Sequence, residues 1–314
     1  MFGQPRLPRI PQDPKAKNKL IYAIVIAILV VVALISGRMK TQQEQAVPQS
    51  DADFQIHVID VGQGDSILVL ADGHAMLVDS GDADSGSTVC SYLKGLGVEK
   101  LDYAVATHLH FDHIGGFSDV LKQFPAEQIL EPSCPDDLLP TNTVYELYLD
   151  AAEASGADCR TAKAGEIFSL GKAQVEVLAP ADAIGENLNN DSLVFRVTYG
   201  DASALLTGDM EHEEEDWLLA QGRELQADFL KVSHHGSANG SGEAFLAAVR
   251  PQFAAISCAK QNDYGHPSQE ALDRLAAYTD EVYVTADGGS IVFLYDAETG
   301  QKRVLTAGQK GSAD

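Results

Sequence analysis

An α/β fold built as one large domain is predicted by two features of the sequence. Of the 314 residues, those from about residue 54 onward alternate between short apolar runs and longer segments of helical periodicity, with no break that would separate two domains. Apolar runs such as Leu101–Ala106 and Ala204–Leu206 are short and end in polar or glycine-containing turns, as buried strands do. Strands that alternate with helices pack as sheets covered by helices.

The individual elements follow from the same patterns. Asp72-Gly73 predicts a hairpin turn between the second and third strands. Strands are predicted at 55–60, 66–70, 75–78, 101–106, 128–131, 165–169, 174–178, 193–199, 204–206, 229–232 and 253–257. Helices are predicted at 87–96, 117–124 and 143–154, from the acidic run that begins near Glu211, and from Pro267 to Tyr278. This order consists of two successive halves, each with strands followed by helices.

Residues 1–53 predict a membrane anchor and a tether. The apolar run Leu20–Ile35 spans about 24 Å as a helix, and Ser36-Gly37 lengthens it to an anchor at 20–37. The basic residues within 1–19 favour a cytoplasmic N-terminus, which places the domain at 54–305 and the tail at 306–314 outside the cell membrane. A cleaved signal peptide is the alternative, although no small-x-small pair ends the run. Residues 38–53, rich in Gln, Glu and Ser, indicate a flexible tether.

The net charge and the cysteines limit the classes of function and the compartments that fit this chain. The chain has 22 Lys and Arg against 46 Asp and Glu, a formal net charge of −24. Such a surface repels polyanions at long range, so a nucleic-acid substrate would be held by local groups and metal ions rather than by a basic face. This argues against a processive DNA-binding protein but not against a metal-dependent phosphodiesterase. The four cysteines are compatible with an oxidising exterior, and the sequence leaves open whether they are bridged or free.

The stretch Thr107–Gly116, THLHFDHIGG, predicts a metal site. It follows a predicted strand and offers His108, His110, Asp112 and His113 at a strand-to-helix turn. Packing does not require such a density of ligands. Imidazole and carboxylate groups together suit zinc, manganese or iron better than calcium or magnesium.

Two further strand ends present histidines. His234 and His235 follow the strand at 229–232, and His266 follows the strand at 253–257. One of these imidazoles is expected to complete a second metal site and another to protonate a leaving group, a role we give to His234. Sequence order alone does not decide between His235 and His266 as the ligand. His212 lies in the acidic run at the start of a helix, which favours a solvated position.

These motifs together resemble the metallo-β-lactamase superfamily. They are HxHxDH after a strand, Asp79 in LVDSGD, Asp209 in LLTGD, the histidine pair in KVSHHGS, and His266 in YGHPS. The last two, with HVIDVGQGDSILV at His57–Val69, resemble the extracytoplasmic hydrolase domain of ComEC-type DNA-uptake proteins and their stand-alone relatives. The resemblance covers about Phe54–Leu294. It implies a four-layer αββα sandwich, with two mixed sheets inside and the site at the sheet edges.

The resemblance also implies a ligand set. His108 and His110 would hold the first metal, Asp112 and His113 the second, and Asp209 would bridge both. Comparison with phosphodiesterases of the superfamily favours His266 as the remaining ligand, whereas comparison with lactamases favours His235. Asp112 would also orient the attacking hydroxide. Asp79 would support the metal loop from outside, or it would cap the helix at 87–96.

One part of the chain departs from the superfamily pattern. A third histidine for the first metal is expected before LLTGD, but the segment Glu186–Ser192, ENLNNDS, contains none. Asn190 or Asp191 would replace it and shift the site towards manganese, or the segment forms an Asx turn and the site holds one metal. Ser237, in a Gly-Ser loop, would donate to a substrate phosphate or belong to a flexible connection.

The expected chemistry is hydrolysis by two divalent ions, Zn or Mn. Such a pair lowers the pKa of a water held between the ions and stabilises the attacking and leaving oxygens. The resemblance implies a phosphodiesterase or nuclease related to DNA uptake, which would need a separate channel because this chain has one apolar span. The alternatives are a hydrolase of small esters or lactones and a non-catalytic module that binds DNA. Oligomeric state is not predicted.

Overall fold

The computed structural model describes residues 48, 50–180 and 187–307. The chain divides into two units, Met1–Glu44 and Gln45–Asp314, and the described residues all belong to the second. The predicted cytoplasmic segment 1–19 and the anchor 20–37 lie outside them, as do most of the tether and of the tail. In the part of the chain that is described, no helix has the length and apolar character needed to cross a bilayer.

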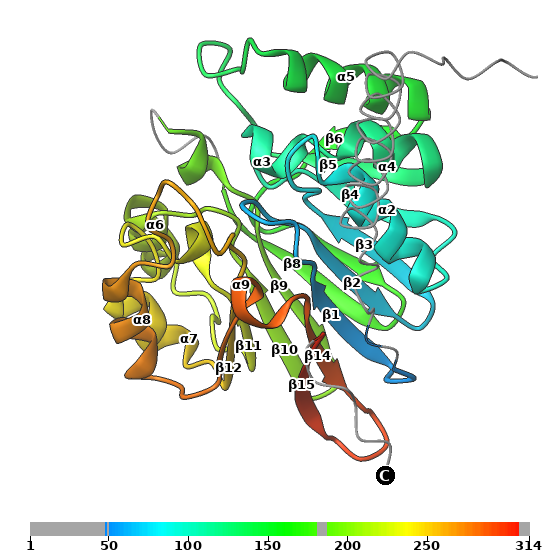
Figure 1. Ribbon diagram of the computed structural model, residues 1–314. Helices are drawn as coiled ribbons and strands as arrows, with labels where there is room; N and C mark the ends of the chain where they lie inside the picture. Colours follow the sequence, from blue (N-terminus) through cyan, green and yellow to red (C-terminus); the bar gives the residue numbers. More distant parts are fainter. Residues whose placement is uncertain (1–47, 49, 181–186, 308–314) are drawn as a thin grey trace, which may run out of the picture. The chain divides into compact units, whose positions relative to one another are not determined.

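The first sheet has eight strands and is mixed (Figure 1). Its strands are antiparallel from β15 to β3 and parallel from β3 to β6. Parallel neighbours need a crossover, and the crossovers here include the helices α2 (Gly86–Gly95), α4 (Phe117–Gln123) and α5 (Thr143–Ser155). In sheet order the strands are β15 (Lys302–Thr306), β14 (Ile291–Tyr295), β1 (Phe54–Val58), β2 (Ile67–Ala71), β3 (His74–Val78), β4 (Leu101–Val105), β5 (Ala126–Glu131) and β6 (Asp158–Thr161).

The second sheet has seven strands and is also mixed. It is parallel from β10 to β13 and antiparallel from β10 to β7. The helices α6 (His212–Ala220), α7 (Glu243–Val249) and α8 (Gln269–Ala276) connect its parallel strands. In sheet order the strands are β13 (Val282–Val284), β12 (Phe253–Ile256), β11 (Phe229–Lys231), β10 (Ala202–Leu206), β9 (Val194–Tyr199), β8 (Ala173–Ala179) and β7 (Ile167–Leu170).

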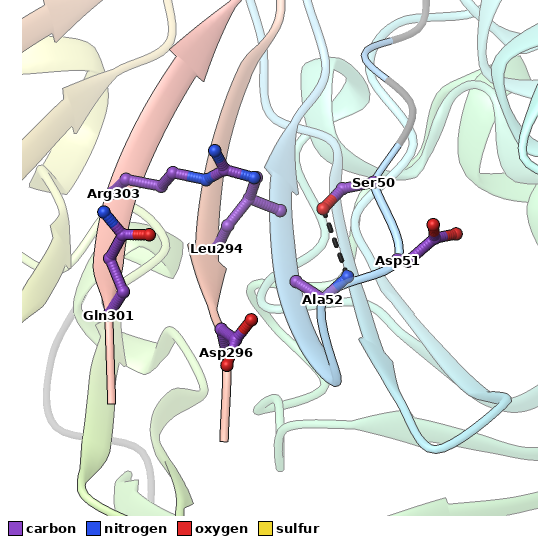
Figure 2. Close-up of a pocket in the computed structure, with 7 residues that line it drawn as sticks. All are labelled: Ser50, Asp51, Ala52, Leu294, Asp296, Gln301 and Arg303. Atoms are coloured by element: carbon purple, nitrogen blue, oxygen red, sulfur yellow. Dashed lines mark hydrogen bonds between the residues drawn. The ribbon is translucent and has the colours of Figure 1, made fainter. Parts of the chain in front are cut away.

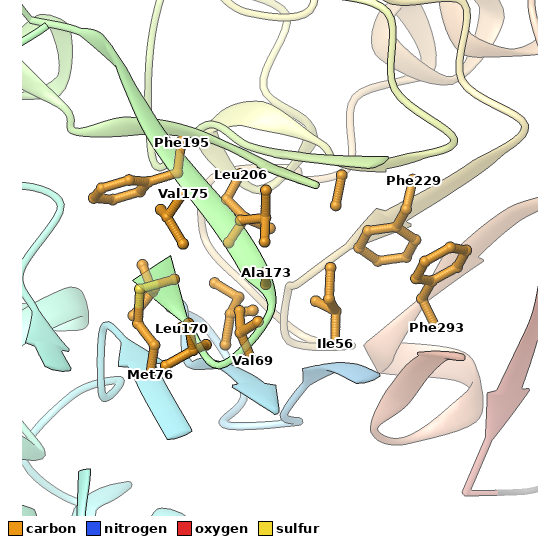
Figure 3. Packing of buried hydrophobic residues seen from close by; sticks show 14 of the residues in the cluster. Ile56, Val69, Met76, Leu170, Ala173, Val175, Phe195, Leu206, Phe229 and Phe293 are labelled. Atoms are coloured by element: carbon orange, nitrogen blue, oxygen red, sulfur yellow. The ribbon is translucent and has the colours of Figure 1, made fainter. Parts of the chain in front are cut away.

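The main hydrophobic core lies between the two sheets (Figure 3). Strand β1 shows why: Phe54, Ile56 and Val58 alternate along it and enter this core, while Gln55 and His57 lie on the opposite face. A second cluster packs the first sheet against α2, α4 and α5, and a third packs the second sheet against α6, α7 and α8. The four layers therefore run helix, sheet, sheet, helix, as predicted.

Most predicted elements occur in the structure, with ends displaced by at most two residues. The predictions do not include β6, β13, β14, β15, α7 or the short α3 (Phe111–Ile114) and α9 (Thr285–Gly288). One predicted helix start is wrong. Helix α8 begins after Ser268, not at Pro267, because the Ser268 hydroxyl accepts a hydrogen bond from the Ala271 amide at 3.1 Å and caps the helix.

Candidate active site

The metal-loop residues lie where β4 ends and α3 begins. His108 and His113 are fully buried, with ring centroids 4.1 Å apart, and His108 Nε2 lies 3.0 Å from His110 Nδ1. Backbone contacts fix the loop from the neighbouring strand ends: Asp65 N donates to Asp112 O at 3.2 Å, and Ser80 N donates to His113 O at 2.7 Å. The loop is thus held as part of the sheet edge.

Gly64 permits this close approach. A Cβ atom at Gly64 would lie 2.4 Å from the carbonyl oxygen of Asp112, and the residue has a φ of +136°. No side chain fits there. The group that approaches Gly64 closely is the metal loop itself.

Asp79 holds His113 from behind. Its Oδ1 accepts from Thr107 N at 2.8 Å, and its Oδ2 accepts from Thr107 Oγ1 at 2.7 Å and lies 2.8 Å from His113 Nδ1. Burial raises the pKa of Asp79, and His113 acts against that rise. This contact leaves His113 Nε2 to face Asp209, whose Oδ2 lies 3.3 Å away. Helix α2 has Ser85 as its N-cap, so the alternative capping role of Asp79 has no basis in the structure.

Asp209 is the point on which the imidazoles converge. It follows β10, and the turn at Gly208 has a φ of +51°. Burial acts to raise its pKa, but His235 and His113 nearby hold the pKa well below the usual range. Four imidazoles place Nε2 near its Oδ2: His113 at 3.3 Å, His235 at 3.5 Å, His234 at 3.7 Å and His108 at 3.9 Å.

His235 completes a second group of ligand atoms. The ligand atoms of Asp112, His113 and His235 lie within 4.8 Å of one another, with His235 Nε2 3.5 Å from Asp112 Oδ2. His235 Nδ1 lies 2.9 Å from the backbone oxygen of Ser257, which makes Nδ1 the donor and leaves Nε2 for a metal.

The backbone at the histidine pair is strained. In the 3-10 segment η2 (Ser233–Gly236), His234 and His235 have φ values of +46° and +54°. Such conformations cost free energy in residues other than glycine, so the surrounding packing must impose them. They direct both neighbouring rings towards the site.

His266 lies beside this group rather than in it. Its ring centroid is 5.4 Å from that of His234 and 6.3 Å from that of His235. Among the residues that the structure describes, His266 is in none of the clusters whose ligand atoms lie close enough to share a metal. The geometry therefore favours His235 as the ligand of the second metal and gives His266 a place in the pocket wall.

The Asn-rich segment brings a different residue to the site than expected. Asn190 Oδ1 accepts from Glu211 N at 3.0 Å, and its amide nitrogen donates to Glu213, so both ends of its side chain are used. Asp191 is buried and does not line the pocket. Asn189 does line it, with Oδ1 buried and without a hydrogen-bond partner. These residues form a short 3-10 turn, η1 (Leu188–Asp191). The sequence does not show which side chain of this turn points towards the pocket.

Ser237 faces its own loop. Its hydroxyl accepts from Asn239 N at 3.2 Å, and its side chain does not line the pocket. Arg274 of α8 fixes the same loop from outside, because its guanidinium donates to the backbone oxygens of Ala238, Gly240 and Ser241 at 2.7–3.0 Å. The loop is held rigidly by α8, and the structure offers no contact from Ser237 to a bound phosphate.

The sequence analysis missed a buried ion pair behind the site. Lys231 and Asp65 are both fully buried, with Nζ 2.7 Å from Oδ2. Asp65 Oδ1 also lies 3.4 Å from His235 Nδ1. Burial acts to raise the pKa of Asp65, but Lys231 and His235 hold it below the usual value. A lysine inside the otherwise apolar strand 229–232 was the available signal, since such a charge needs a buried partner.

These groups open into a pocket of about 190 Å³. A larger cavity of about 340 Å³ lies elsewhere, at the β14–β15 hairpin, with Ser50, Asp296 and Arg303 in its wall (Figure 2). That cavity contains no histidine, so it does not compete as a metal site. The pocket over the histidines is lined by Gln63, His110, Phe111, Asp112, Asn189, Asp209, His234, His235, Tyr264 and His266.

Comparison with known families agrees with the site. Residues 59–260 match the sequence profile of the metallo-beta-lactamase superfamily. The chain belongs to this superfamily. Its members generally bind divalent metals, often zinc.

Similar curated proteins are competence and recombination proteins. ComE operon protein 3 of Bacillus subtilis is 31% identical over 275 residues, which cover 81% of this chain and 34% of that protein. Competence protein ComA of Neisseria gonorrhoeae is 30% identical, with 85% and 35% covered, and Recombination protein 2 of Haemophilus influenzae is 30% identical, with 77% and 29% covered. The predicted resemblance is confirmed. The chain spans about a third of the length of these relatives.

Solved structures support the fold. The metallo-beta-lactamase fold protein YhfI from Bacillus subtilis has a TM-score of 0.52 at 13% identity, and 76% of this chain and 99% of that chain are covered. CmlA from Streptomyces venezuelae, a diiron beta-hydroxylase, has a TM-score of 0.51 at 13% identity, with 82% and 55% covered. At this identity the comparisons establish the metallo-β-lactamase fold alone.

The residues present fit a metal. His113 Nε2, His235 Nε2 and Asp209 Oδ1 are buried, and none has a hydrogen-bond partner. Buried polar atoms are nearly always satisfied, so a cluster of unsatisfied ligand atoms requires an explanation. A divalent cation, bound by imidazole nitrogen and carboxylate oxygen, provides one.

Proposed function

We propose that this chain is a metal-dependent phosphodiesterase that cleaves DNA. The observation that carries the proposal is the convergence of four Nε2 atoms on one oxygen of Asp209, at the floor of an open pocket. The similarity to competence and recombination proteins supports DNA as the substrate.

The proposal includes two metal sites, supported by the close clusters of ligand atoms around Asp209 and His235. His108 and Asp209 would hold the first ion, and Asp112, His113 and His235 the second, with Asp209 shared. Among the described residues His110, like His266, lies in none of the close ligand clusters. His110 would join the first ion from the pocket wall, where its Nδ1 lies 3.0 Å from His108 Nε2. Zinc and manganese both suit this mixture of imidazole and carboxylate. When bound, the ions would act as Lewis acids on the phosphate and favour ionisation of the attacking water.

Asp112 and His234 are placed to handle protons. Asp112 lines the pocket and can accept a hydrogen bond from the attacking water, which orients the water towards phosphorus. His234 Nδ1 lies 3.1 Å from Glu211 Oε1, a contact that orients the ring. Its Nε2 is then available to donate a proton to the leaving oxygen.

The cellular placement is a proposal that rests on the sequence alone. The apolar run at 20–37 and the basic residues within 1–19 support a single-pass anchor in the cell membrane with the catalytic domain outside. In that position the enzyme would meet incoming DNA before uptake, and a separate channel protein would carry the product strand.

Hydrolysis assays test the activity. The full chain, stripped of metal and then restored with Mn²⁺ or Zn²⁺, is given bis(p-nitrophenyl) phosphate and DNA. We expect cleavage only after metal is restored, and Asp112→Asn should lower turnover about 100-fold or more while leaving the fold intact. Bound metal without phosphodiester cleavage would contradict the proposal and direct attention to esters and lactones. Failure to bind metal would instead favour a DNA-binding module.

A further inference from the structure

Two exposed aromatic rings stand at the rim of the catalytic pocket. Phe111 is 49% exposed and Tyr264 is 63% exposed, and both line the pocket. They come from different halves of the chain: Phe111 begins α3 between two metal-loop residues, and Tyr264 lies in the loop between β12 and α8. Within the described residues, only Leu147, Leu149 and Ile167 are comparably exposed large hydrophobic side chains, and none of these lines the pocket.

Tyr264 is already arranged as a stacking surface. Its ring lies nearly parallel to that of His266, with centroids 5.7 Å apart and an angle of 26° between the planes. The ring is therefore supported on one side and open to solvent on the other. Large apolar groups exposed beside a functional pocket commonly mark the place where a ligand binds.

The described lining of the pocket offers no lysine or arginine to a polyanion. None of its described lining residues is Lys or Arg, and the whole chain carries a formal net charge of −24. Electrostatic tracking of a phosphate backbone is the usual source of nucleic-acid affinity, and this surface cannot supply it. What the pocket can supply is metal ligands at the floor and aromatic rings at the rim.

The size of the pocket determines which part of a substrate meets the metal ligands and which part meets the aromatic rings. A volume of about 190 Å³ is below the roughly 300–1,000 Å³ that encloses a drug-sized ligand. The pocket therefore has room for a phosphate group but not for the nucleosides on either side of it. Those nucleosides would lie at the rim, next to Phe111 and Tyr264.

We propose that Phe111 and Tyr264 stack on unpaired bases next to the scissile phosphate, so that the substrate is single-stranded DNA. This rests on the proposed phosphodiesterase function and narrows its substrate. Paired bases in a duplex are stacked on each other and cannot reach the rings, whereas the bases of a single strand can turn outward. Stacking does not depend on sequence, so cleavage would be sequence-tolerant.

The test compares three substrates with the metal-loaded full chain. They are a labelled single-stranded oligodeoxynucleotide, the same strand annealed to its complement, and a strand of equal length in which abasic sites replace the bases. We expect the wild-type protein to prefer the base-bearing single strand to both others. Tyr264→Ala and Phe111→Ala should each lower kcat/KM for that strand about 5- to 100-fold, which corresponds to the loss of one stacked base.

The matched controls remove exposed apolar side chains elsewhere. Leu147→Ala and Ile167→Ala should leave kcat/KM within twofold of wild type on every substrate. Tyr264→Phe keeps the ring and should retain activity, whereas Tyr264→Leu keeps apolar surface without a ring and should not. Metal content is measured for each variant, because Phe111→Ala could disturb the metal loop. Tyr264 lies outside that loop and keeps the test decisive.

The ratio of base-bearing to abasic cleavage decides the proposal. It should fall towards one in Tyr264→Ala. An equal loss on both strands would show that the ring only shapes the site, and no loss on either strand would show that it does not contact substrate; each result overturns the inference. If the wild-type protein with bound metal cleaves none of the three strands or bis(p-nitrophenyl) phosphate, the proposed function fails instead.

Discussion

The first sheet contributes its ligands through one short loop, whereas the second sheet collects them from the ends of separate strands. The loop Thr107–Gly116 carries four candidate ligands, all with negative φ, and Asp79 holds it through three contacts. Asp209 and His235 follow different strands, and the histidine has a positive φ. Behind them lies the buried pair of Lys231 and Asp65. The first half, whose ligands are contiguous in the chain, is fixed by hydrogen bonds from Asp79. The second half, whose ligands are assembled from separate strands, depends on burial and charge.

Removing the charge of Asp209, which histidines of both halves approach, should have the largest effect. Asp209→Asn keeps the shape of the side chain but removes the charge on which four imidazoles converge. We expect bound metal to fall from two ions to one or none per chain, and phosphodiester cleavage to fall by about 10³-fold, which corresponds to several kcal/mol of transition-state stabilisation. Elemental analysis and the cleavage assay measure the two effects. A variant that keeps both metals and its activity would show that the halves do not meet at Asp209.

Breaking the buried pair tests the assembled half. Lys231→Met leaves Asp65 charged in a buried position without its lysine partner, which should lower the free energy of unfolding by about 3–5 kcal/mol. Denaturant titration measures this loss. Lys100→Met is the control, because Lys100 pairs with Glu127 at the exposed surface and should change stability little. The double variant Lys231→Met with Asp65→Asn should recover part of the loss, and no recovery would mean that the pair is not the cause.

Asp79→Asn tests the contiguous half. The amide keeps the size of the side chain but holds His113 Nδ1 less well and offers it no charge. Loss of such a supporting hydrogen bond should weaken metal affinity or activity about 10- to 100-fold, with little change in fold. Competition with a chelator measures the affinity. The nearer partner of His235 Nδ1 is a backbone oxygen, at 2.9 Å, which no side-chain variant removes. If Asp79→Asn bound metal as tightly as the wild-type protein, the hydrogen bonds of Asp79 would not be what fixes the metal loop.

The last prediction concerns a buried histidine outside the site. His57 forms hydrogen bonds to the neutral side chains of Tyr92 and Gln55, at 3.0 and 3.1 Å, and burial lowers its pKa to about 3. Since the unfolded chain binds this proton near its ordinary pKa, folding stability should fall as pH decreases from about 6.5 to 3, by about 1.4 kcal/mol per pH unit. In His57→Gln the dependence should be shallower by that amount. Equal slopes, measured by denaturant titration at several pH values, would count against a neutral buried ring.

The same contrast explains what could be predicted from the sequence. The metal loop could be identified because its ligands are adjacent in the chain and follow a strand. The choice between His235 and His266 could not, since it depends on whether Ser257 O orients one ring. Asn189 could not be chosen over Asn190 because a 3-10 turn sets its direction. Strand β14 is different: Ile291–Tyr295 is a fully buried apolar run that local pattern was sufficient to find.

Strand order in the first sheet bears on how the domain folds and comes apart. β1 begins the domain and pairs with β14 near its end, with Phe54 opposite Tyr295, while every strand of the second sheet lies between them in the chain. The polypeptide leaves the first sheet, builds the second and then returns. Contacts of such long sequence separation make folding slow, and they cannot form on the ribosome until the last strands have emerged. The hairpin of β14 and β15, which follows the second sheet in the chain, also packs into the first sheet. We therefore expect the two sheets to unfold together.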